Sequence, residues 1–352
     1  MNITAAALGA GERVAWPDPI LRAAVKVLVG RTKRRLNRAG VAAELDFALR
    51  MAGYPIATNV SEANDQHYEL PAEFFALMLG PQRKYSCCYY QDSSASLAQA
   101  EERALVETAE HAALADGQRI LELGCGWGSL SLWMARKYPS ARILSVSNSR
   151  SQRAFITNAA ESEGLQNLTV VAADINSFEP AGQFDRVVSV EMFEHMSNWR
   201  ELLRRIASWL TPQGALFIHV FSHACAPYRF DASDRTDWIA RHFFTGGVMP
   251  SRGLIRQFGD LLAVEREWWW DGIHYRRTAE HWLQNFDRDA ALIGNVLRDI
   301  YGKDAALWHR RWRLFLHATS GLFGHSNGQE WGVSHYRLRP SRRFSLRHEP
   351  RD

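Results

Sequence analysis

A glycine-rich loop behind an acidic residue is the clearest chemical signal in this chain of 352 residues. Residues 120–129 read Ile-Leu-Glu-Leu-Gly-Cys-Gly-Trp-Gly-Ser. Glycines let the backbone turn tightly and approach a ligand closely. A carboxylate here would repel the phosphates of a dinucleotide, which favour a helix N-terminus, but would attract the sulfonium and ammonium groups of S-adenosylmethionine. We therefore predict that Glu122, Gly124 and Gly126 bind S-adenosylmethionine, and that the chain is a methyltransferase rather than a dehydrogenase.

Glu191, Glu194 and His195 form a second group that could do chemistry, at the end of an apolar stretch and in the turn after it. Methyl transfer from a sulfonium is an in-line displacement, which an enzyme assists mainly by proximity and alignment. An amine nucleophile must first lose a proton. Two carboxylates can hold an ammonium, and an imidazole can accept its proton near pH 7. The alternative is that Glu194 and His195 only cap the next helix; beside a methyl-donor site we predict catalysis.

Polar residues also follow two other apolar stretches. Ser147 ends one of them, with Gln152 shortly after, and Asp174 ends the next. The acidic residue that would hold the ribose of NAD about 20 positions past the first glycine is missing, since Leu144 stands there. Ligands of doubly wound sheets lie across the carboxyl ends of the strands. We predict that Asp174 accepts a hydrogen bond from adenine; its alternative role is a helix N-cap.

Alternating strand and helix patterns must position these residues. Apolar runs predict strands at 118–123, 142–147, 168–172, 184–190 and 214–221, with helical segments between them. This rhythm indicates an α/β fold, a mostly parallel sheet with helices on both faces. Helical spacing also appears at 18–50, with a second helix suggested from residue 42, and at 96–114. Two further strands are expected at 262–270 and 330–338.

The order of these elements predicts one elaborated core. We expect the following division: an N-terminal helical cap at 1–84, a Rossmann-like cofactor-binding core at 85–223, a mostly helical substrate-binding insertion at 224–325, the last core strand at 326–339 and a basic tail at 340–352. We interpret the basic residues at 31–35 and in the tail as solvated surface rather than a lipid-binding site, because neither segment has a large apolar face.

Composition limits the classes of function. Hydrophobic residues make up 46% of the chain, no apolar run is long enough to span a bilayer, and residues 1–9 do not read as a signal peptide. The four cysteines (87, 88, 125 and 225) have no C-x-x-C spacing, so we expect neither a metal nor disulfides, and a cytoplasmic location. A net charge of +4 does not indicate a nucleic-acid partner.

Several stretches resemble the cyclopropane-fatty-acid synthase superfamily, and within it the coclaurine N-methyltransferase group most of all. The main ones are Tyr-Ser-Cys-Cys-Tyr-Tyr at 85–90, Leu-Glu-Leu-Gly-Cys-Gly-Trp-Gly at 121–128 and Val-Glu-Met-Phe-Glu-His-Met at 190–196. Matching stretches at 64–71, 238–250, 272–275 and 328–335 extend the resemblance over roughly residues 60–338. It implies the Rossmann-like fold of class I S-adenosylmethionine-dependent methyltransferases.

The resemblance also implies roles for single residues. Tyr85 and Ser86 would bind the cofactor, as would Ser147 and Gln152, which match the family's hydroxyl-and-glutamine pattern after the second strand. The 191–195 stretch would position and deprotonate a small amine. Aromatic residues of the late segment, Trp331 among them, suit a flat aromatic or bicyclic amine, although core packing is the alternative for each.

The lipid branch of the superfamily gives the rival interpretation. There the methyl group adds to an alkene of an unsaturated acyl chain and a bicarbonate ion removes a proton. The ligands of that ion resemble Cys87, Glu194, His219 and Tyr275. Glu191 favours the amine, because a carboxylate facing an alkene would be a desolvated charge without a partner. Weak membrane contact is expected only in the lipid alternative, and the family allows for a homodimer.

Overall fold

The structure is a computed structural model that describes residues 12, 14–37, 42–58, 70–234 and 237–341. The expected N-terminal segment 1–9, most of the family-like stretch at 64–71 and the tail beyond residue 341 lie outside these residues.

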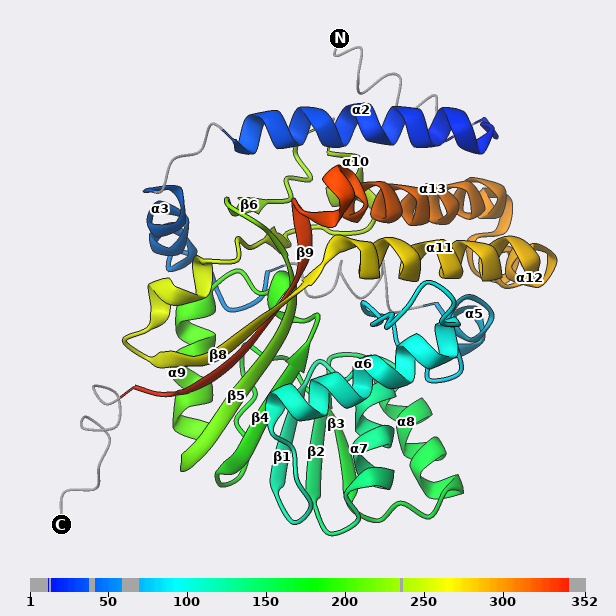
Figure 1. The fold of residues 1–352 in the computed structure, drawn as a ribbon. Helices are drawn as coiled ribbons and strands as arrows, with labels where there is room; N and C mark the ends of the chain where they lie inside the picture. Colours follow the sequence, from blue (N-terminus) through cyan, green and yellow to red (C-terminus); the bar gives the residue numbers. More distant parts are fainter. Residues whose placement is uncertain (1–11, 13, 38–41, 59–69, 235–236, 342–352) are drawn as a thin grey trace, which may run out of the picture.

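A seven-stranded sheet forms the centre of the molecule (Figure 1), with strand order β3-β2-β1-β4-β5-β9-β8. The first five strands in this order are parallel, while β9 runs antiparallel to both β5 and β8. The strands are β1 (Arg119–Leu123), β2 (Arg142–Ser147), β3 (Leu168–Ala172), β4 (Phe184–Val190), β5 (Leu210–His223), β8 (Leu262–Asp271) and β9 (Trp331–Pro340). The mostly parallel Rossmann-like sheet predicted from the sequence is confirmed.

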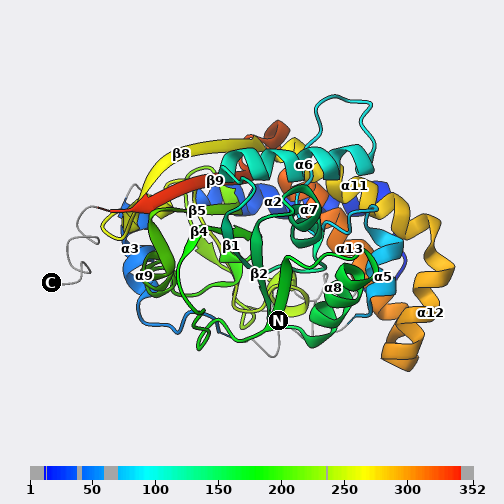
Figure 2. The same ribbon diagram turned by 90° about the horizontal axis from the view of Figure 1, so that it is seen from below.

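Helices cover both faces of the sheet (Figure 2) because the strands present apolar residues alternately to either side. Ile120 faces α6 (Leu97–Ala112) and α7 (Ser129–Lys137), whereas the adjacent Leu121 faces α9 (Trp199–Trp209). Helix α8 (Arg150–Ser162) packs beside α7. The sequence pattern predicted helical segments at these places. The capping box of Ser96 and Gln99 fixes where α6 begins.

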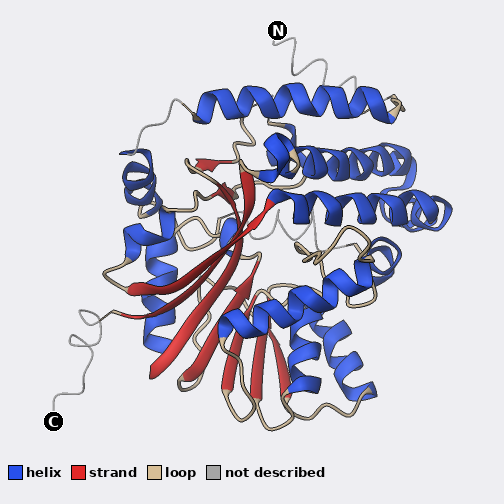
Figure 3. Cartoon of the chain, viewed as in Figure 1, coloured by secondary structure: helices blue, strands red, loops and turns tan. Residues whose placement is uncertain are grey.

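A second layer of helices lies over one end of the sheet, as Figures 1 and 3 show. It joins segments from both ends of the chain into one apolar core. Its helices are α2 (Asp18–Leu36), α5 (Ala72–Met78), α11 (Gly272–Arg288), α12 (Ala290–Tyr301) and α13 (Ala305–Phe323). The helix α3 (Ala42–Met51) packs instead against the core beside α9. This helical layer covers the carboxyl ends of the parallel strands, where the candidate site lies.

The structure adds detail that the sequence pattern did not predict. Strand β5 is longer than expected, and the region 224–261 contains a two-stranded ribbon, β6 (Tyr228–Arg229) with β7 (Val248–Met249), besides the short helix α10 (Trp238–His242). None of the helices in the described ranges is both long and apolar enough to cross a bilayer.

Candidate active site

The glycine loop between β1 and α7 can be built only with glycine at its ends. Gly124 and Gly128 have φ of +80° and +81°. A Cβ on Gly124 would lie 2.8 Å from Met192 Cβ, and one on Gly128 would lie 2.7 Å from a carbon of Ile156. Gly126, at φ +51°, meets open space instead. The loop is therefore pressed against its neighbours at both ends and open to a cavity in the middle.

This cavity, here called the donor cavity, holds about 1270 Å³ of empty space at the carboxyl ends of β1, β2, β3 and β4. All the residues predicted to bind the cofactor line it: Tyr85, Ser86, Glu122, Gly124, Gly126, Ser147, Gln152 and Asp174. The structure thus brings together predicted residues from three strand ends and from the 85–90 loop, as expected for a ligand of a doubly wound sheet.

Buried polar groups of the donor cavity fit S-adenosylmethionine. Glu122 is 3% exposed and accepts a hydrogen bond from Ser145 at 2.7 Å. Burial raises the pKa of this carboxyl to about 7, so a cationic group would stabilise its ionised form. Ser147 donates to Gln152 Oε1 at 2.7 Å, which leaves the buried amide nitrogen of Gln152 without a hydrogen-bond partner among the described residues. That nitrogen is available to a ligand.

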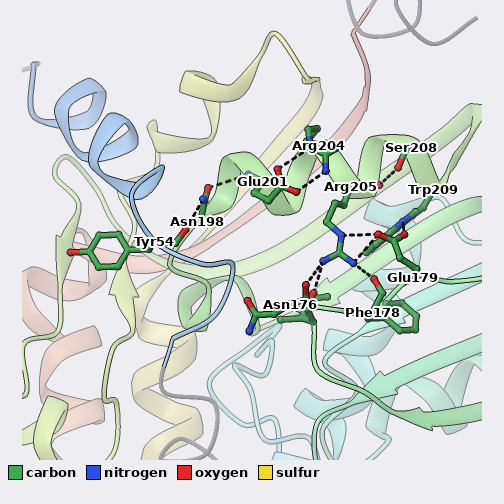
Figure 4. Close-up of polar contacts among 11 residues, drawn as sticks. Tyr54, Asn176, Phe178, Glu179, Asn198, Glu201, Arg204, Arg205, Ser208 and Trp209 are labelled. Carbon is green, nitrogen blue, oxygen red and sulfur yellow. Dashed lines mark hydrogen bonds and ion pairs between the residues drawn. The ribbon is translucent and has the colours of Figure 1, made fainter.

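Asp174 lines the donor cavity and also caps a local turn. Its Oδ1 accepts from the backbone and side-chain nitrogens of Asn176 at 2.8 and 3.0 Å. Arg205 of α9 holds the backbone just after Asp174 by hydrogen bonds (Figure 4). Its guanidinium donates to the carbonyls of Ile175 and Asn176 at 2.7 and 3.1 Å. No helix begins in the described residues directly after Asp174, so the carboxylate is not the helix N-cap of the alternative interpretation; it accepts hydrogen bonds in a turn and lies beside the ligand space.

A second cavity, here called the substrate cavity, opens next to the first and holds about 780 Å³ of empty space. Tyr85, Glu191 and His195 line both cavities. The remaining lining is mostly aromatic and aliphatic: Phe221, Phe230, Ile239, Phe244, Met249, Tyr275, Trp282, Phe315, Leu322 and Phe323, with Glu194 and Thr319. A group in the substrate cavity would therefore meet a donor group at the Glu191–His195 segment.

Glu191 is held in place by three hydrogen-bonding partners. Its Oε1 accepts from the backbone amide of Cys87 at 2.9 Å and lies 3.2 Å from His219 Nε2, while Tyr275 donates to Oε2 at 2.7 Å. Its φ of +47° is unusual for a residue with a side chain. Burial raises the pKa of Glu191 against the opposing effect of the Lys84 cation. The carboxylate is thus fixed at the junction of the two cavities.

Glu194 is a buried carboxyl with one oxygen that is unpaired within the described residues. It is 1% exposed, and its Oε2 has no hydrogen-bond partner in the part of the chain that the structure describes. Burial and the nearby charge of Glu191 raise its pKa well above the usual value. Such a group needs either a proton or a cation.

His195 differs from the expectation. Its ring lies 4.5 Å from the ring of Phe244, and burial lowers its pKa to about 4. The same burial raises the pKa values of Glu191 and Glu194. The two carboxylates are therefore the stronger proton acceptors, and the imidazole, which we expected to accept a proton near pH 7, is the weaker one.

The other predicted pocket residues divide into two groups. Tyr275 lines the substrate cavity, whereas Cys87 and His219 line neither cavity and contact Glu191 instead. Trp331 lines neither cavity: it is fully buried, with its ring 5.0 Å from that of His223. Trp331 therefore packs in the core, which was the alternative to a place in the substrate pocket. Within the described residues, no group of three or more His, Cys, Asp or Glu side chains is arranged to hold a metal ion.

Two residues near the site were missed by the sequence interpretation. Lys84 is 2% exposed and donates to Ser86 Oγ at 2.5 Å and to the Cys87 carbonyl at 2.7 Å. The buried carboxylate of Glu101 accepts from the backbone amides of Gly80 and Gln82 at 3.1 and 2.9 Å. Both residues shape the loop that carries Tyr85. Lys84 directly precedes the family-like stretch at 85–90, which was the only signal available for it.

Comparisons with known proteins agree with this geometry. A family model described as mycolic acid cyclopropane synthetase matches residues 57–331. The (S)-coclaurine N-methyltransferase of Thalictrum flavum subsp. glaucum is 34% identical over 328 residues, which are 91% of each chain. The cyclopropane-fatty-acyl-phospholipid synthase of Escherichia coli K12 is 28% identical over 85% of this chain and 76% of that one.

Solved structures give the same result. A crystal structure of coclaurine N-methyltransferase bound to N-methylheliamine and SAH matches with a TM-score of 0.89 and 32% identity, over 92% of this chain and 96% of that one. The cyclopropane synthase MmaA2 from Mycobacterium tuberculosis matches with a TM-score of 0.67 at 20% identity, which is evidence for the fold alone. The chain therefore belongs to the mycolic acid cyclopropane synthetase family and is an S-adenosylmethionine-dependent methyltransferase.

Proposed function

We propose that this methyltransferase N-methylates a small amine that carries an aromatic or bicyclic group. The observation that carries the proposal is the buried Glu194 carboxyl, which lines an aromatic cavity and whose Oε2 has no hydrogen-bond partner among the described residues. A charge in such surroundings is costly unless it is paired. An ammonium group supplies the missing partner both before transfer, as substrate, and after transfer, as the more highly methylated product.

The apolar lining of the substrate cavity supports the same proposal. Trp282, Phe244 and Tyr275 offer faces and edges to a flat ring system. Aromatic faces also attract a cation, by about 0.5–2 kcal/mol. The relatives named coclaurine N-methyltransferase, one of them solved with N-methylheliamine, add support from outside the site.

In the proposed mechanism, residues of the chain bind the amine, orient it and remove its proton. Bound S-adenosylmethionine supplies an electrophilic methyl group on a sulfonium. Glu194 pairs with the ammonium, and Glu191, at the junction of the cavities, accepts the proton that the nitrogen must lose. His195, which lines both cavities, stays neutral near pH 7 and orients the amine. The aromatic walls exclude water from the nucleophile.

The position of Glu191 argues against the lipid alternative. Cys87, His219 and Tyr275, which resemble bicarbonate ligands of the lipid branch, all contact the Glu191 carboxylate here. The protein's own carboxylate therefore stands where that anion would be expected.

The test is an assay of the pure protein with methyl-labelled S-adenosylmethionine against primary, secondary and tertiary amines and against unsaturated phospholipid vesicles. We expect label in amines only. Glu194→Gln should raise the KM for amines while cofactor affinity stays within about twofold, whereas the exposed control Glu161→Gln should change neither. A methylene-addition or methyl-branched lipid product that survives Glu191→Gln, with no amine product, would overturn the proposal.

A further inference from the structure

Three buried histidines connect the active site to the outer surface of the protein. His219 of β5 and His335 of β9 stand directly opposite each other in the sheet register, and His335 Nε2 lies 2.8 Å from His219 Nδ1. His111, in the last turn of α6, places its Nδ1 2.8 Å from His335 Nδ1. The sheet register and the helix that packs on that face thus bring three imidazoles into one continuous hydrogen-bonded line.

A carboxylate stands at each end of this line. At the inner end, His219 Nε2 is 3.2 Å from Glu191 Oε1. At the outer end, His111 Nε2 is 3.3 Å from Glu107 Oε2, and the side chain of Glu107 is 14% exposed. We call the whole set the histidine row: Glu191, His219, His335, His111 and Glu107.

The histidine row is one proton short. It contains four links between neighbouring groups. Three neutral imidazoles carry three protons, so with both carboxylates ionised one link is empty. When the empty link is the one between Glu191 and His219, a proton on Glu191 can pass to His219 Nε2. Each ring proton then crosses its own link to the next group, and the last one reaches Glu107, because an imidazole accepts at one nitrogen as it donates from the other.

The surroundings keep the row neutral and dry. Burial lowers the pKa of His111 to about 4 and those of His219 and His335 well below the usual value. The ring of Trp268 stacks on His111 at 3.9 Å, and that of Trp270 lies 4.2 Å from His335. The charged groups that face the row are Glu107 and Arg103 on α6, Arg337 on β9, Lys84 in the loop before Cys87, and Glu191 after β4.

We propose that the histidine row is a proton relay, which carries the proton released by the amine from the active site to the surface at Glu107. The proposal rests on the proposed function, because the proton that it carries is the one released by an amine substrate that binds as an ammonium. The histidines and Glu107 act through Glu191 and are positioning residues rather than catalytic ones.

The proton balance of the reaction requires such an exit. A bound ammonium loses one N–H proton and keeps the electron pair on nitrogen. That pair forms the N–C bond to the methyl group, and the electron pair of the broken C–S bond stays on the thioether sulfur. One proton per methyl group must therefore leave a cavity walled by aromatic side chains. Glu191 accepts it, the row shifts outward, and Glu107 releases it to water. The rings then return to their starting tautomers.

A structural role alone does not explain the composition of the row. Directly opposite positions of neighbouring strands point to the same face, where apolar pairs pack well. Phe217, two residues before His219 on the same face, is such an apolar core residue. Instead the sheet buries two imidazoles that are 0% exposed, and their ring nitrogens pair with each other, with His111 and with Glu191.

The kinetic test uses His335→Gln, since an amide cannot accept a proton at one atom and pass one on from another as imidazole does. About two pH units below the pKa of the amine, the turnover of His335→Gln should be lower than that of wild type on the order of 100-fold, the scale of a lost proton-transfer step. Above the pKa of the amine, where free amine binds, the rate should return to within about twofold of wild type. The control His309→Gln, outside the row, should match wild type at every pH.

An equal loss at all pH values, or no loss, would overturn the relay. If His335→Gln does not fold, His111→Gln is the second variant, because His111 lies on the helix rather than in the sheet. We expect the same pH-dependent loss of turnover from it. Amine methylation by wild type at alkaline pH tests the proposed function separately.

A measurement without substrate distinguishes the two proposals further. In the full chain with ¹⁵N-labelled histidine, the nitrogen resonances of His219 and His111 should change with one shared midpoint during a pH titration, because linked sites titrate together. In His335→Gln the two midpoints should separate. Independent midpoints in wild type would overturn the relay even if amines are methylated.

Discussion

The backbone amide of Cys87 donates to the Glu191 carboxylate at 2.9 Å, and so ties the 85–90 loop to the end of β4. This contact fixes the wall between the donor cavity and the substrate cavity, since Tyr85 and Glu191 line both. Cys87, His219 and Tyr275, which resemble bicarbonate ligands of the lipid branch, thus contact a carboxylate of the chain itself. The consequence is chemical: a carboxylate built into the chain needs no dissolved anion to replace it.

Bicarbonate should therefore have no effect on the wild-type enzyme. Amine methylation measured in bicarbonate-free buffer should not change on adding bicarbonate. Glu191→Gly should remove the carboxylate and accept the φ of +47° without strain, which leaves Cys87, His219 and Tyr275 facing an empty space. We expect turnover to fall by about 100-fold or more and to recover in part with added bicarbonate or formate. A wild-type enzyme that requires bicarbonate would contradict this assignment.

Glu122 should make cofactor binding depend on pH. Burial raises the pKa of this carboxyl to about 7 in the free protein, and a bound cation favours the ionised form. Binding then releases a proton, so affinity for S-adenosylmethionine should increase as pH rises from about 6 to 8. Glu122→Gln should weaken binding by about 1–3 kcal/mol at pH 8 and abolish this pH dependence. Calorimetry at several pH values measures both, and a wild-type affinity that is flat with pH would refute the role.

Asp174 should contribute to binding through the adenine that cofactor and product share. Asp174→Ala should weaken affinity for S-adenosylmethionine and S-adenosylhomocysteine by similar factors. Because Asp174 Oδ1 also accepts from Asn176, the matched control is Asn176→Ala, which removes the side-chain contact in the turn and keeps the carboxylate. If the control weakens binding as much as Asp174→Ala, the residue acts through the turn and not through adenine.

The sequence predicted the sheet well because each buried strand is a short apolar run between turn residues. The predicted runs at 142–147, 168–172 and 184–190 match β2, β3 and β4 residue for residue. Glu122, Ser147 and Asp174 could be picked out as candidates by the same logic because they stand where strands end, whereas Tyr85 and Ser86 came only from the resemblance to the family. The lengthened β5 and the β6–β7 ribbon could not be predicted, because both depend on partners that come later in the chain.

The aromatic residues and the histidine row show what periodicity cannot decide. Trp282 lines the substrate cavity and Trp331 packs in the core, although both are buried tryptophans of the same late segment. Only the fold separates them. His219 and His335 interrupt apolar strands, which is a signal in itself, but their pairing required the antiparallel register of β9 on β5. His111, on a distant helix, offered no signal toward either.

The buried Glu194 carboxyl, which we propose binds an ammonium, should lower the free energy of unfolding of the protein without substrate. Burial and the charge of Glu191 raise the pKa of this carboxyl well above 4.5, the value expected in the unfolded chain. Between these two values the folded state binds more protons than the unfolded state, so the free energy of unfolding falls as pH rises, by about 1.4 kcal/mol per pH unit. Glu194→Gln carries no charge and should lose this dependence.

Thermal melts at several pH values test this directly. The Glu194→Gln variant and wild type should differ in melting temperature by a constant amount well below pH 4.5, where the carboxyl is protonated in both states, and the melting temperature of the variant should rise relative to wild type by a growing margin toward pH 8. Glu161→Gln, at an exposed position of α8, should follow wild type throughout. A saturating amine should raise the melting temperature of wild type more than that of Glu194→Gln, because only the carboxylate gains a partner. If Glu194→Gln instead melts lower at every pH, the carboxyl already has a partner in the folded protein, and the argument for an ammonium site at Glu194 fails.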